Sequence, residues 1–223
     1  MSITRLLLWL LALIGFALTP LAVQAHPHVW VTTITEIIHD AQGRVTGFRH
    51  HWTFDEIFSA FAAQGMDKNG DGKFDRQELT ALAKVNITSL SEYDFFTHAK
   101  NAENSIPLTE PLDGYYLSHE EGKLTLHFVL PLKAPLDARS AQLNFAIYDP
   151  TYYVAFSYAK TSPVQLASNA PNGCRVEMRK PDPLSSKEVK LSDLSEAFFN
   201  ELGQGSNIGS EFAQDVLVSC KPE

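Results

Sequence analysis

The sequence has little of what marks a nucleic-acid-binding protein or an integral membrane protein. Basic residues are in the minority, since 18 Lys and Arg face 26 Asp and Glu and the formal net charge is −8. An acidic chain of this kind is repelled by nucleic acid and by an anionic membrane surface, so we expect neither as a partner. Beyond residue 25 no hydrophobic run is long enough to span a bilayer, so we expect no membrane span in the mature chain.

Motifs of common enzyme classes are also absent. The chain contains no G-x-S-x-G nucleophile elbow, no H-E-x-x-H zinc motif and no phosphate-binding glycine loop. Its only two cysteines, Cys174 and Cys220, are much further apart than the C-x-x-C spacing of redox pairs. In an exported protein we expect them to form a disulfide, with a metal-binding or redox-active thiol pair as the alternative. We therefore expect a protein that is not an enzyme.

Residues 1–25 have the features of a secretory signal peptide. Arg5 precedes an apolar run over 6–18, and the last three residues, Val-Gln-Ala, fit a small-x-small cleavage site. We expect cleavage at the end of this segment and export of the mature chain, with an uncleaved N-terminal anchor as the alternative. The remaining residues, 26–223, are of a suitable length for a single domain.

Residues 67–78 match the calcium loop of an EF-hand, D-x-[DN]-x-[DN]-G-x5-E, at every required position. Alternate residues place oxygen ligands around a hard cation, and one of them supplies only its backbone carbonyl. Gly72 stands where the chain must turn sharply, and the apolar Phe74 is expected to enter a core. The predicted Ca²⁺ ligands are Asp67, Asn69, Asp71, Lys73 (through its carbonyl), Asp75 and Glu78. The alternative is a solvated acidic loop that binds nothing tightly.

Hydrophobic periodicity predicts the secondary structure. Residues 28–40 and 44–52 alternate between apolar and polar types around a turn, which is typical of a β-hairpin. The spacing then becomes helical, with Thr53 as the expected N-cap of a helix over 54–66 and a second helix from the calcium loop to about residue 93. A further short helix is predicted at 191–202, and further strands at 94–100, 112–119, 123–131, 142–149, 151–159, 173–179 and 212–219.

These elements predict one α+β domain over 26–223. We expect an antiparallel, β-sandwich-like body with an EF-hand-type helix–loop–helix inserted at about 54–93. Between two of the predicted strands lies the motif Asp149-Pro150-Thr151-Tyr152-Tyr153. We expect a turn in which the Asp149 carboxylate bonds its own backbone, with the alternative that Asp149 and a tyrosine hydroxyl face a site.

Four histidines form a second, speculative candidate site. Signal cleavage leaves His26-Pro27-His28 at the mature N-terminus, where an amine and two imidazoles suit Ni²⁺, Co²⁺, Zn²⁺ or Cu. His50 and His51 lie in the partner strand of the predicted hairpin, and one of them is expected to approach His28 if the register allows it. The alternative is that these histidines are ordinary strand residues.

Several motifs, taken in order, resemble a bacterial family. They are residues 26–30, residues 52–56, the acidic loop, residues 148–156, and a single cysteine followed by Phe212-Ala213 and a terminal cysteine. Together they resemble the exported proteins grouped as domain of unknown function 1007, often labelled periplasmic components of ABC-type transport systems. The resemblance implies a periplasmic protein that assists an inner-membrane transporter in handling a divalent metal or another solute. We therefore expect a calcium-binding, non-enzymatic accessory or solute-binding component, with a transition-metal chaperone as the alternative.

Overall fold

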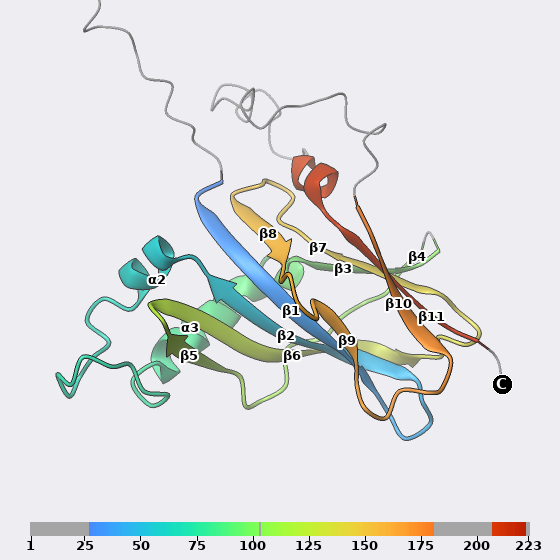
Figure 1. Cartoon of the computed structure of the whole chain (residues 1–223), viewed down its shortest axis with the longest axis horizontal. Helices are drawn as coiled ribbons and strands as arrows, with labels where there is room; N and C mark the ends of the chain where they lie inside the picture. Colours follow the sequence, from blue (N-terminus) through green and yellow to red (C-terminus); the bar gives the residue numbers. More distant parts are fainter. Residues whose placement is uncertain (1–26, 103, 181–206, 222–223) are drawn as a thin grey trace, which may run out of the picture.

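A computed structural model of the chain describes residues 27–102, 104–180 and 207–221, and it is mostly β structure with two α-helices (Figure 1). The predicted signal peptide, His26 and the predicted helix at 191–202 lie outside the described residues. Among those that are described, no helix is long and apolar enough to cross a membrane. In this coarse sense the α+β prediction is confirmed, because the strands form two sheets and the helices accompany them.

The predicted β-hairpin opens the fold. β1 (Val29–His39) and β2 (Val45–Phe54) pair in an antiparallel arrangement. The turn between them forms because the Asp40 carboxylate accepts the backbone N–H groups of Gln42 and Arg44, each at 2.9 Å. Alternate residues of both strands are buried, so one face of the hairpin lies on the core.

The first sheet is built on this hairpin. It adds β5 (Tyr116–Glu120), β6 (Lys123–Leu136), β8 (Val154–Tyr158) and β9 (Val164–Leu166). The strand order is β5-β6-β2-β1-β8, and β9 pairs further along β1. β8 and β9 run parallel to β1, so the expectation of an antiparallel body is wrong at this edge. The reason is that the chain enters β8 from the second sheet, in the same direction as β1.

The second sheet is antiparallel throughout. It contains β3 (Thr97–Asn101), β4 (Asn104–Ser105), β7 (Leu143–Ile147), β10 (Cys174–Arg179) and β11 (Asp215–Cys220). The strand order is β10-β11-β7-β3-β4. The sequence did not predict β4 or β9, because strands of 2 and 3 residues are too short to show a periodic pattern.

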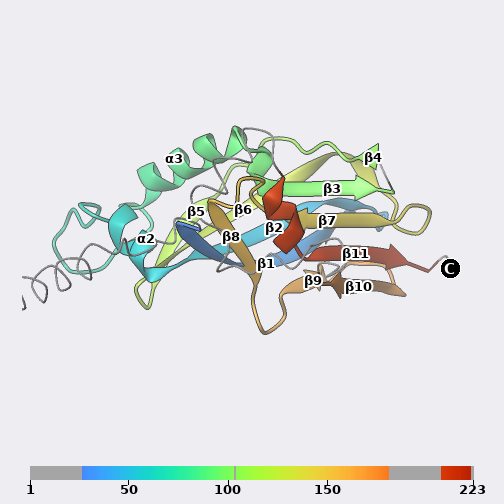
Figure 2. The ribbon, with the colours of Figure 1, turned by 90° about the horizontal axis from the view of Figure 1, so that it is seen from above.

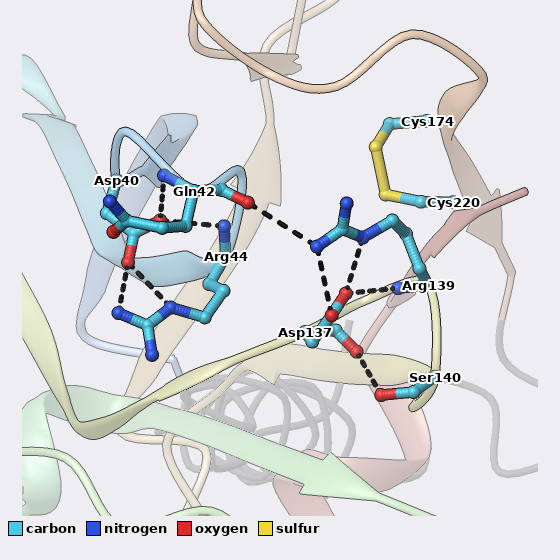
Figure 3. Close-up of a disulfide and its surroundings, with 8 residues drawn as sticks. All are labelled: Asp40, Gln42, Arg44, Asp137, Arg139, Ser140, Cys174 and Cys220. Atoms are coloured by element: carbon cyan, nitrogen blue, oxygen red, sulfur yellow. Dashed lines mark hydrogen bonds and ion pairs between the residues drawn. A yellow bond between two sulfur atoms is a disulfide. The ribbon is translucent and has the colours of Figure 1, made fainter. Parts of the chain in front are cut away.

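The predicted disulfide is confirmed. Cys174 and Cys220 are opposite each other in the pairing of β10 with β11, and their sulfur atoms are bonded. Figure 3 shows this bond near Arg139, which is ion-paired with Asp137 and also donates a hydrogen bond to the carbonyl of Gln42 at 3.4 Å. One end of the molecule is therefore held by a covalent bond and by polar contacts to the hairpin turn.

The two sheets pack against each other around one core (Figure 2). Phe48 of β2 lies against Phe145 of β7, with ring centroids 4.6 Å apart. Trp52 meets the rings of Phe128 and Phe156 edge-on, at 5.0 and 4.9 Å, which is a favoured geometry for aromatic pairs. The alternation predicted for β6 is confirmed, because its residues are buried at every second position over most of its length.

Two helices follow the hairpin. α2 (Glu56–Ala62) is shorter than the predicted span 54–66, and α3 (Thr80–Ser91) begins after the acidic loop. α3 lies on the same side of the first sheet as β3 (Figure 2), and its buried face joins the core. Among the described residues, two 3-10 turns lead into strands: η1 (Asp94–Phe96) precedes β3, and η3 (Ile208–Phe212) precedes β11.

Asp55 fastens the start of α2 to the hairpin. One carboxylate oxygen caps the helix by accepting the N–H of Phe58 at 2.9 Å, and the other accepts the N–H of Trp30 in β1 at 3.0 Å. The prediction of Thr53 as N-cap is therefore wrong. Thr53 still belongs to β2, and its hydroxyl is hydrogen-bonded to that of Thr125 in β6 at 2.9 Å.

Candidate functional site

The acidic loop between α2 and α3 is folded around the carboxylates of its first and last predicted ligands. Asp67 accepts the backbone N–H groups of Gly70 at 2.7 Å and Gly72 at 3.0 Å. Glu78 reaches across the loop and accepts the N–H groups of Lys68 at 2.7 Å and Asp75 at 3.0 Å. Both carboxylates are therefore turned toward the backbone of their own loop.

The predicted ligands between these two residues repeat one local hydrogen bond. Asn69, Asp71 and Asp75 each accept, through a side-chain oxygen, the backbone N–H of a residue two or three positions ahead, at 2.8–2.9 Å. Gly70 and Gly72 have φ angles of 73° and 77°, a left-handed conformation that is strained for other residue types. The sharp turn predicted at Gly72 is present, and it depends on glycine.

The donor set of this loop suits a hard divalent cation, since all six predicted ligands offer oxygen. In the structure, each carboxylate of the loop accepts hydrogen bonds from different backbone N–H groups. Within residues 27–102, 104–180 and 207–221, no group of three or more His, Cys, Asp or Glu side chains is gathered closely enough to hold a metal ion. Binding of Ca²⁺ therefore requires the carboxylates to turn from these amides toward a common centre.

Two residues of the loop contact β5, the edge strand of the first sheet, one on each of its faces. The Phe74 ring meets His119 edge-on, with centroids 4.7 Å apart. The Arg76 guanidinium lies 3.8 Å from the ring centroid of Tyr116 and donates to the carbonyl of Gly114 at 3.3 Å. Tyr116 and His119 point to opposite faces of β5, because strand side chains alternate. The prediction that Phe74 enters a core is confirmed, since it packs, partly buried, against the core.

The contact at Tyr116 leads to a pair of histidines on the outer face of the sheet. The Tyr116 ring stacks on that of His127, with centroids 4.3 Å apart. Nδ1 of His127 lies 2.6 Å from Nδ1 of His51, and Nε2 of His127 lies 2.9 Å from the hydroxyl oxygen of Ser118. At so short a distance one Nδ1 atom donates a proton and the other accepts it.

Burial favours the uncharged form of both histidines of this pair. Burial, followed by the charges of His51 and Arg76, lowers the pKa of His127 to about 4. Burial, followed by the charge of Arg49, lowers the pKa of His51, although Glu36 opposes this effect. Neutral imidazoles are the form that binds transition metals, so the lowered pKa values favour the protonation state that a metal ligand needs.

His50 points to the opposite side of β2 and belongs to the core. It is completely buried, with Nδ1 3.0 Å from the hydroxyl of Thr35 and Nε2 3.5 Å from that of Thr97. Burial, followed by the charge of His51, lowers the pKa of His50 to about 3. This side chain therefore joins the two sheets as a neutral polar group.

The expected approach of His28 to a hairpin histidine is wrong. The register places His51 opposite Ile34. His28 immediately precedes β1, six residues before Ile34, and because a strand rises about 3.3 Å per residue it lies about 20 Å from that position. The His28 ring packs instead on Tyr153, with centroids 4.6 Å apart. Its neighbour in the predicted metal site, His26, lies outside the described residues.

The Asp149 motif forms the expected turn between β7 and β8. Asp149 is 4% exposed. One carboxylate oxygen accepts the N–H and the hydroxyl of Thr151, both at 2.9 Å, and the other accepts the N–H of Val154 at 2.9 Å. Gly209 packs so closely that an added Cβ there would stand 1.8 Å from the Asp149 carbonyl oxygen. The carboxylate is thus engaged by its own turn.

Sequence reasoning missed the partner of His51. His127 alternates with the buried residues of β6, so its outward direction follows from the strand pattern. Its pairing with His51 does not, because the two residues are 76 positions apart and meet only when β6 adds to the hairpin. The same holds for Tyr116 and Ser118, which β5 contributes.

Comparisons with known proteins find relatives along most of the chain. The family described as "Protein of unknown function (DUF1007)" matches residues 11–220. An "Uncharacterized protein" of Haemophilus influenzae is 30% identical over 200 residues, which are 89% of this chain and 93% of that protein. An "Uncharacterized 15.5 kDa protein in trpE 3'region" of Spirochaeta aurantia is 35% identical over 100 residues, which are 45% of this chain and 70% of that protein. The family match spans the hairpin, the acidic loop and both cysteines.

Proposed function

The chain belongs to the family described as "Protein of unknown function (DUF1007)", as its motifs indicated, and we propose that it is an exported calcium-binding protein that serves a transport system. In this proposal it is not an enzyme. It acts as an accessory or solute-binding component beside an inner-membrane transporter, in the periplasm. The Ca²⁺ site is the loop of residues 67–78, and the cation has a structural role.

The loop carries this proposal through its complete oxygen donor set on a backbone already turned at two left-handed glycines. Asp67 and Glu78, at its two ends, accept backbone N–H groups from within the loop, so both carboxylates already lie over its backbone. Two of the three cationic side chains of the loop are directed elsewhere: Lys68 donates to the carbonyl of Gly65 at 2.8 Å, and Arg76 contacts β5. A Ca²⁺ ion would thus neutralise the loop carboxylates without competition from these groups.

The position of the loop supports a structural role for the cation. Phe74 contacts one face of β5 through His119, and Arg76 contacts the other through Tyr116, so the loop is anchored to this edge strand at two points. A cation that cross-links the two halves of the loop would fix both contacts at once. A single loop also lacks the second hand that calcium sensors use, and exported modules of this type bind Ca²⁺ with dissociation constants of about 10⁻⁴–10⁻³ M.

Two features support the exported location in this proposal. The Cys174–Cys220 disulfide is the kind of bond that persists in an oxidising compartment such as the periplasm. The first 25 residues have the charge, apolar run and cleavage site of a signal peptide. The assignment to a transport system comes from the motif resemblance alone, so it needs its own test.

Unfolding in urea tests the structural role of Ca²⁺. A ligand that binds only the folded state stabilises it by RT ln(1 + [L]/Kd), so 1 mM Ca²⁺ at a dissociation constant of 10⁻⁴–10⁻³ M should add about 0.4–1.4 kcal/mol. We therefore expect the urea midpoint to rise in millimolar Ca²⁺ relative to a chelator, and to rise less in equal Mg²⁺. An identical midpoint in Ca²⁺ and in the chelator would contradict the proposal.

The transport role is tested in cells that lack the gene. We expect a lower cellular content of one divalent metal or solute, restored by the full chain and not by a chain without residues 1–25. Metal contents measured by mass spectrometry would identify the transported ion. Unchanged contents across the divalent metals, together with unchanged growth on limiting metal, would contradict a role in metal uptake.

The His51–His127 pair favours a second candidate function, transition-metal binding. Two metal–nitrogen bonds of about 2.0–2.1 Å at a tetrahedral angle separate the nitrogens by about 3.3 Å. The present separation of the Nδ1 atoms is 2.6 Å, so a small ring movement admits Ni²⁺, Co²⁺, Zn²⁺ or Cu. The mature N-terminus with His26 and His28 is the competing site.

Metal analysis of the natively processed protein separates the two sites. Loss of bound metal in His127→Ala, with retention in His28→Ala, assigns it to the pair. The opposite result assigns it to the N-terminus. Protein that retains no transition metal after purification and shows none after dialysis against micromolar Zn²⁺ would remove this candidate function.

A further inference from the structure

A cavity of about 360 Å³ lies beside β3, at the edge of the second sheet that the short strand β4 only partly covers. Its lining comes from η1, from β3 and from the segment 105–110. Part of the lining is apolar and buried or half-buried: Phe95, Ala99, Ile106 and Leu108. The volume falls within the range of small-molecule sites, about 300–1,000 Å³.

Charged side chains of both signs line this cavity. Asp94 comes from η1, Lys100 from β3 and Glu110 from the segment that follows β4, and all three are exposed. Within the part of the chain that the structure describes, none of the three forms an ion pair. The ammonium and the carboxylates therefore border the same space without pairing, and a molecule that carries both charges could bridge them.

A left-handed turn holds Asp94 at the cavity. Asp94, Phe95 and Phe96 have φ angles of 49°, 50° and 45°, which residues other than glycine rarely adopt. Both phenylalanine side chains are buried, so packing in the core maintains this turn despite its cost. Because strained backbone of this kind is concentrated at ligand sites, the turn is an observation in favour of binding that is independent of the charges.

His98 lies near both signs of charge. Its Nε2 donates to the carbonyl of Tyr148 at 3.2 Å, and its ring stacks on that of Tyr148 with centroids 4.0 Å apart. Burial lowers the pKa of His98, the hydrogen bond to Tyr148 and the charge of Asp94 oppose this effect, and the charge of Lys100 adds to it. Burial thus favours the uncharged ring, and Lys100 is the only Lys or Arg among the described residues that line the cavity.

We infer that this cavity binds a free α-amino acid with an aliphatic side chain. The carboxylate of the ligand pairs with Lys100, its ammonium pairs with Asp94, and its side chain packs on the apolar lining. An amine without a carboxylate would be repelled by Lys100, and a carboxylate without an amine would be repelled by Asp94 and Glu110. The cavity shares no lining residue with the acidic loop or with the His51–His127 pair, so the inference depends on neither proposed metal site.

Three related molecules test the inference by calorimetric titration. L-Leucine carries both charges, 4-methylpentanoate lacks the amine, and 3-methylbutylamine lacks the carboxylate. We expect saturable binding of leucine at neutral pH and binding of each analogue that is weaker by about tenfold or more, because each loses one charge-assisted contact. This comparison uses the unmodified protein, so it does not depend on the folding of a variant.

Two variants assign the charges of the ligand to residues. Lys100→Gln should weaken leucine binding about tenfold without weakening binding of 3-methylbutylamine. Asp94→Asn should weaken leucine binding to a similar degree without weakening binding of 4-methylpentanoate. Lys84→Gln is the matched control, because Lys84 is exposed on α3 and does not line the cavity. The inference is overturned if the wild type shows no saturable leucine binding, if either analogue binds as leucine does, or if Lys100→Gln and Asp94→Asn bind leucine as the wild type does.

Discussion

The guanidinium of Arg76 lies 3.8 Å from the ring centroid of Tyr116, and this contact joins the acidic loop to the outer face of the first sheet. Tyr116 in turn stacks on His127, whose Nδ1 faces that of His51. A continuous series of contacts therefore runs from the candidate calcium loop to the histidine pair. Through these contacts, a change in the conformation of the loop should change the pKa values of His51 and His127.

Replacement of Arg76 tests this link. The positive charge of Arg76 lowers the pKa of His127, so Arg76→Ala should raise that pKa toward its ordinary value. NMR titration of the imidazole C–H resonances measures the change. Lys68→Ala is the matched control, because it removes a cation of the same loop that is bonded to Gly65 and does not contact the pair. If Arg76→Ala leaves the His127 pKa where it was, the link does not exist.

Acid should destabilise the protein partly through His50. Burial lowers the pKa of His50 from 6.5 to about 3, so the folded state keeps it neutral while the unfolded chain takes up a proton near pH 6.5. This contribution to stability is fully present above pH 6.5 and is lost as pH falls toward 3. The expected loss for this one residue is about 2 kcal/mol at pH 5, measured by urea unfolding at pH 7 and pH 5.

The variant His50→Gln isolates this contribution. It keeps a neutral polar group between Thr35 and Thr97 but does not titrate in this range. Its difference in unfolding free energy between pH 7 and pH 5 should be smaller than that of the wild type by roughly 2 kcal/mol. An equal pH dependence in both proteins would show that His50 is not the responsible group.

Loss of the Asp55 carboxylate should destabilise the start of α2. Asp55→Ala removes the helix cap and the acceptor for the Trp30 N–H, and we expect a cost of about 1–2 kcal/mol in urea unfolding. Asp55→Asn keeps one oxygen acceptor and should cost less. Glu56→Ala is the control, since the ion pair of Glu56 with Lys123, at 3.5 Å, is exposed and should contribute little. A cost for Asp55→Ala no greater than that of Glu56→Ala would refute this role.

Reduction of the disulfide should lower the free energy of unfolding. The bond joins residues 46 positions apart, and a closed loop of that length is worth about 3–4 kcal/mol. Urea unfolding with and without a thiol reductant measures this difference. The double variant Cys174→Ser, Cys220→Ser should have the urea midpoint of the reduced protein, and the reductant should not change that midpoint. A wild-type midpoint that the reductant does not move would contradict a stabilising bond.

Local patterns in the sequence predicted the elements whose signal is local. The hairpin follows from the alternation of β1 and β2 and from the Asp40 turn, and β6 follows from its long alternation. The disulfide was predicted from the cysteine number together with the expected export. The loop of residues 67–78 was recognised because its ligand types and glycines recur at fixed positions.

Features that depend on distant contacts were not predictable in this way. Thr53 and Asp55 both suit an N-cap, and Asp55 is the cap because β2 continues through Thr53 to pair with β6. The parallel entry of β8 beside β1 depends on how the chain returns from the second sheet. The meeting of His51 with His127 depends on the same long-range pairing of strands.

Calorimetric titration of the purified protein with Ca²⁺ tests the central claim most directly. The account predicts a single site with a dissociation constant of about 10⁻⁴–10⁻³ M. Glu78→Gln, which removes the charge of the expected bidentate ligand, should weaken binding at least about tenfold. Glu110→Gln, at an exposed carboxylate outside the loop, should bind as the wild type does. Absence of binding at millimolar Ca²⁺, or equal binding by Glu78→Gln, would contradict the account.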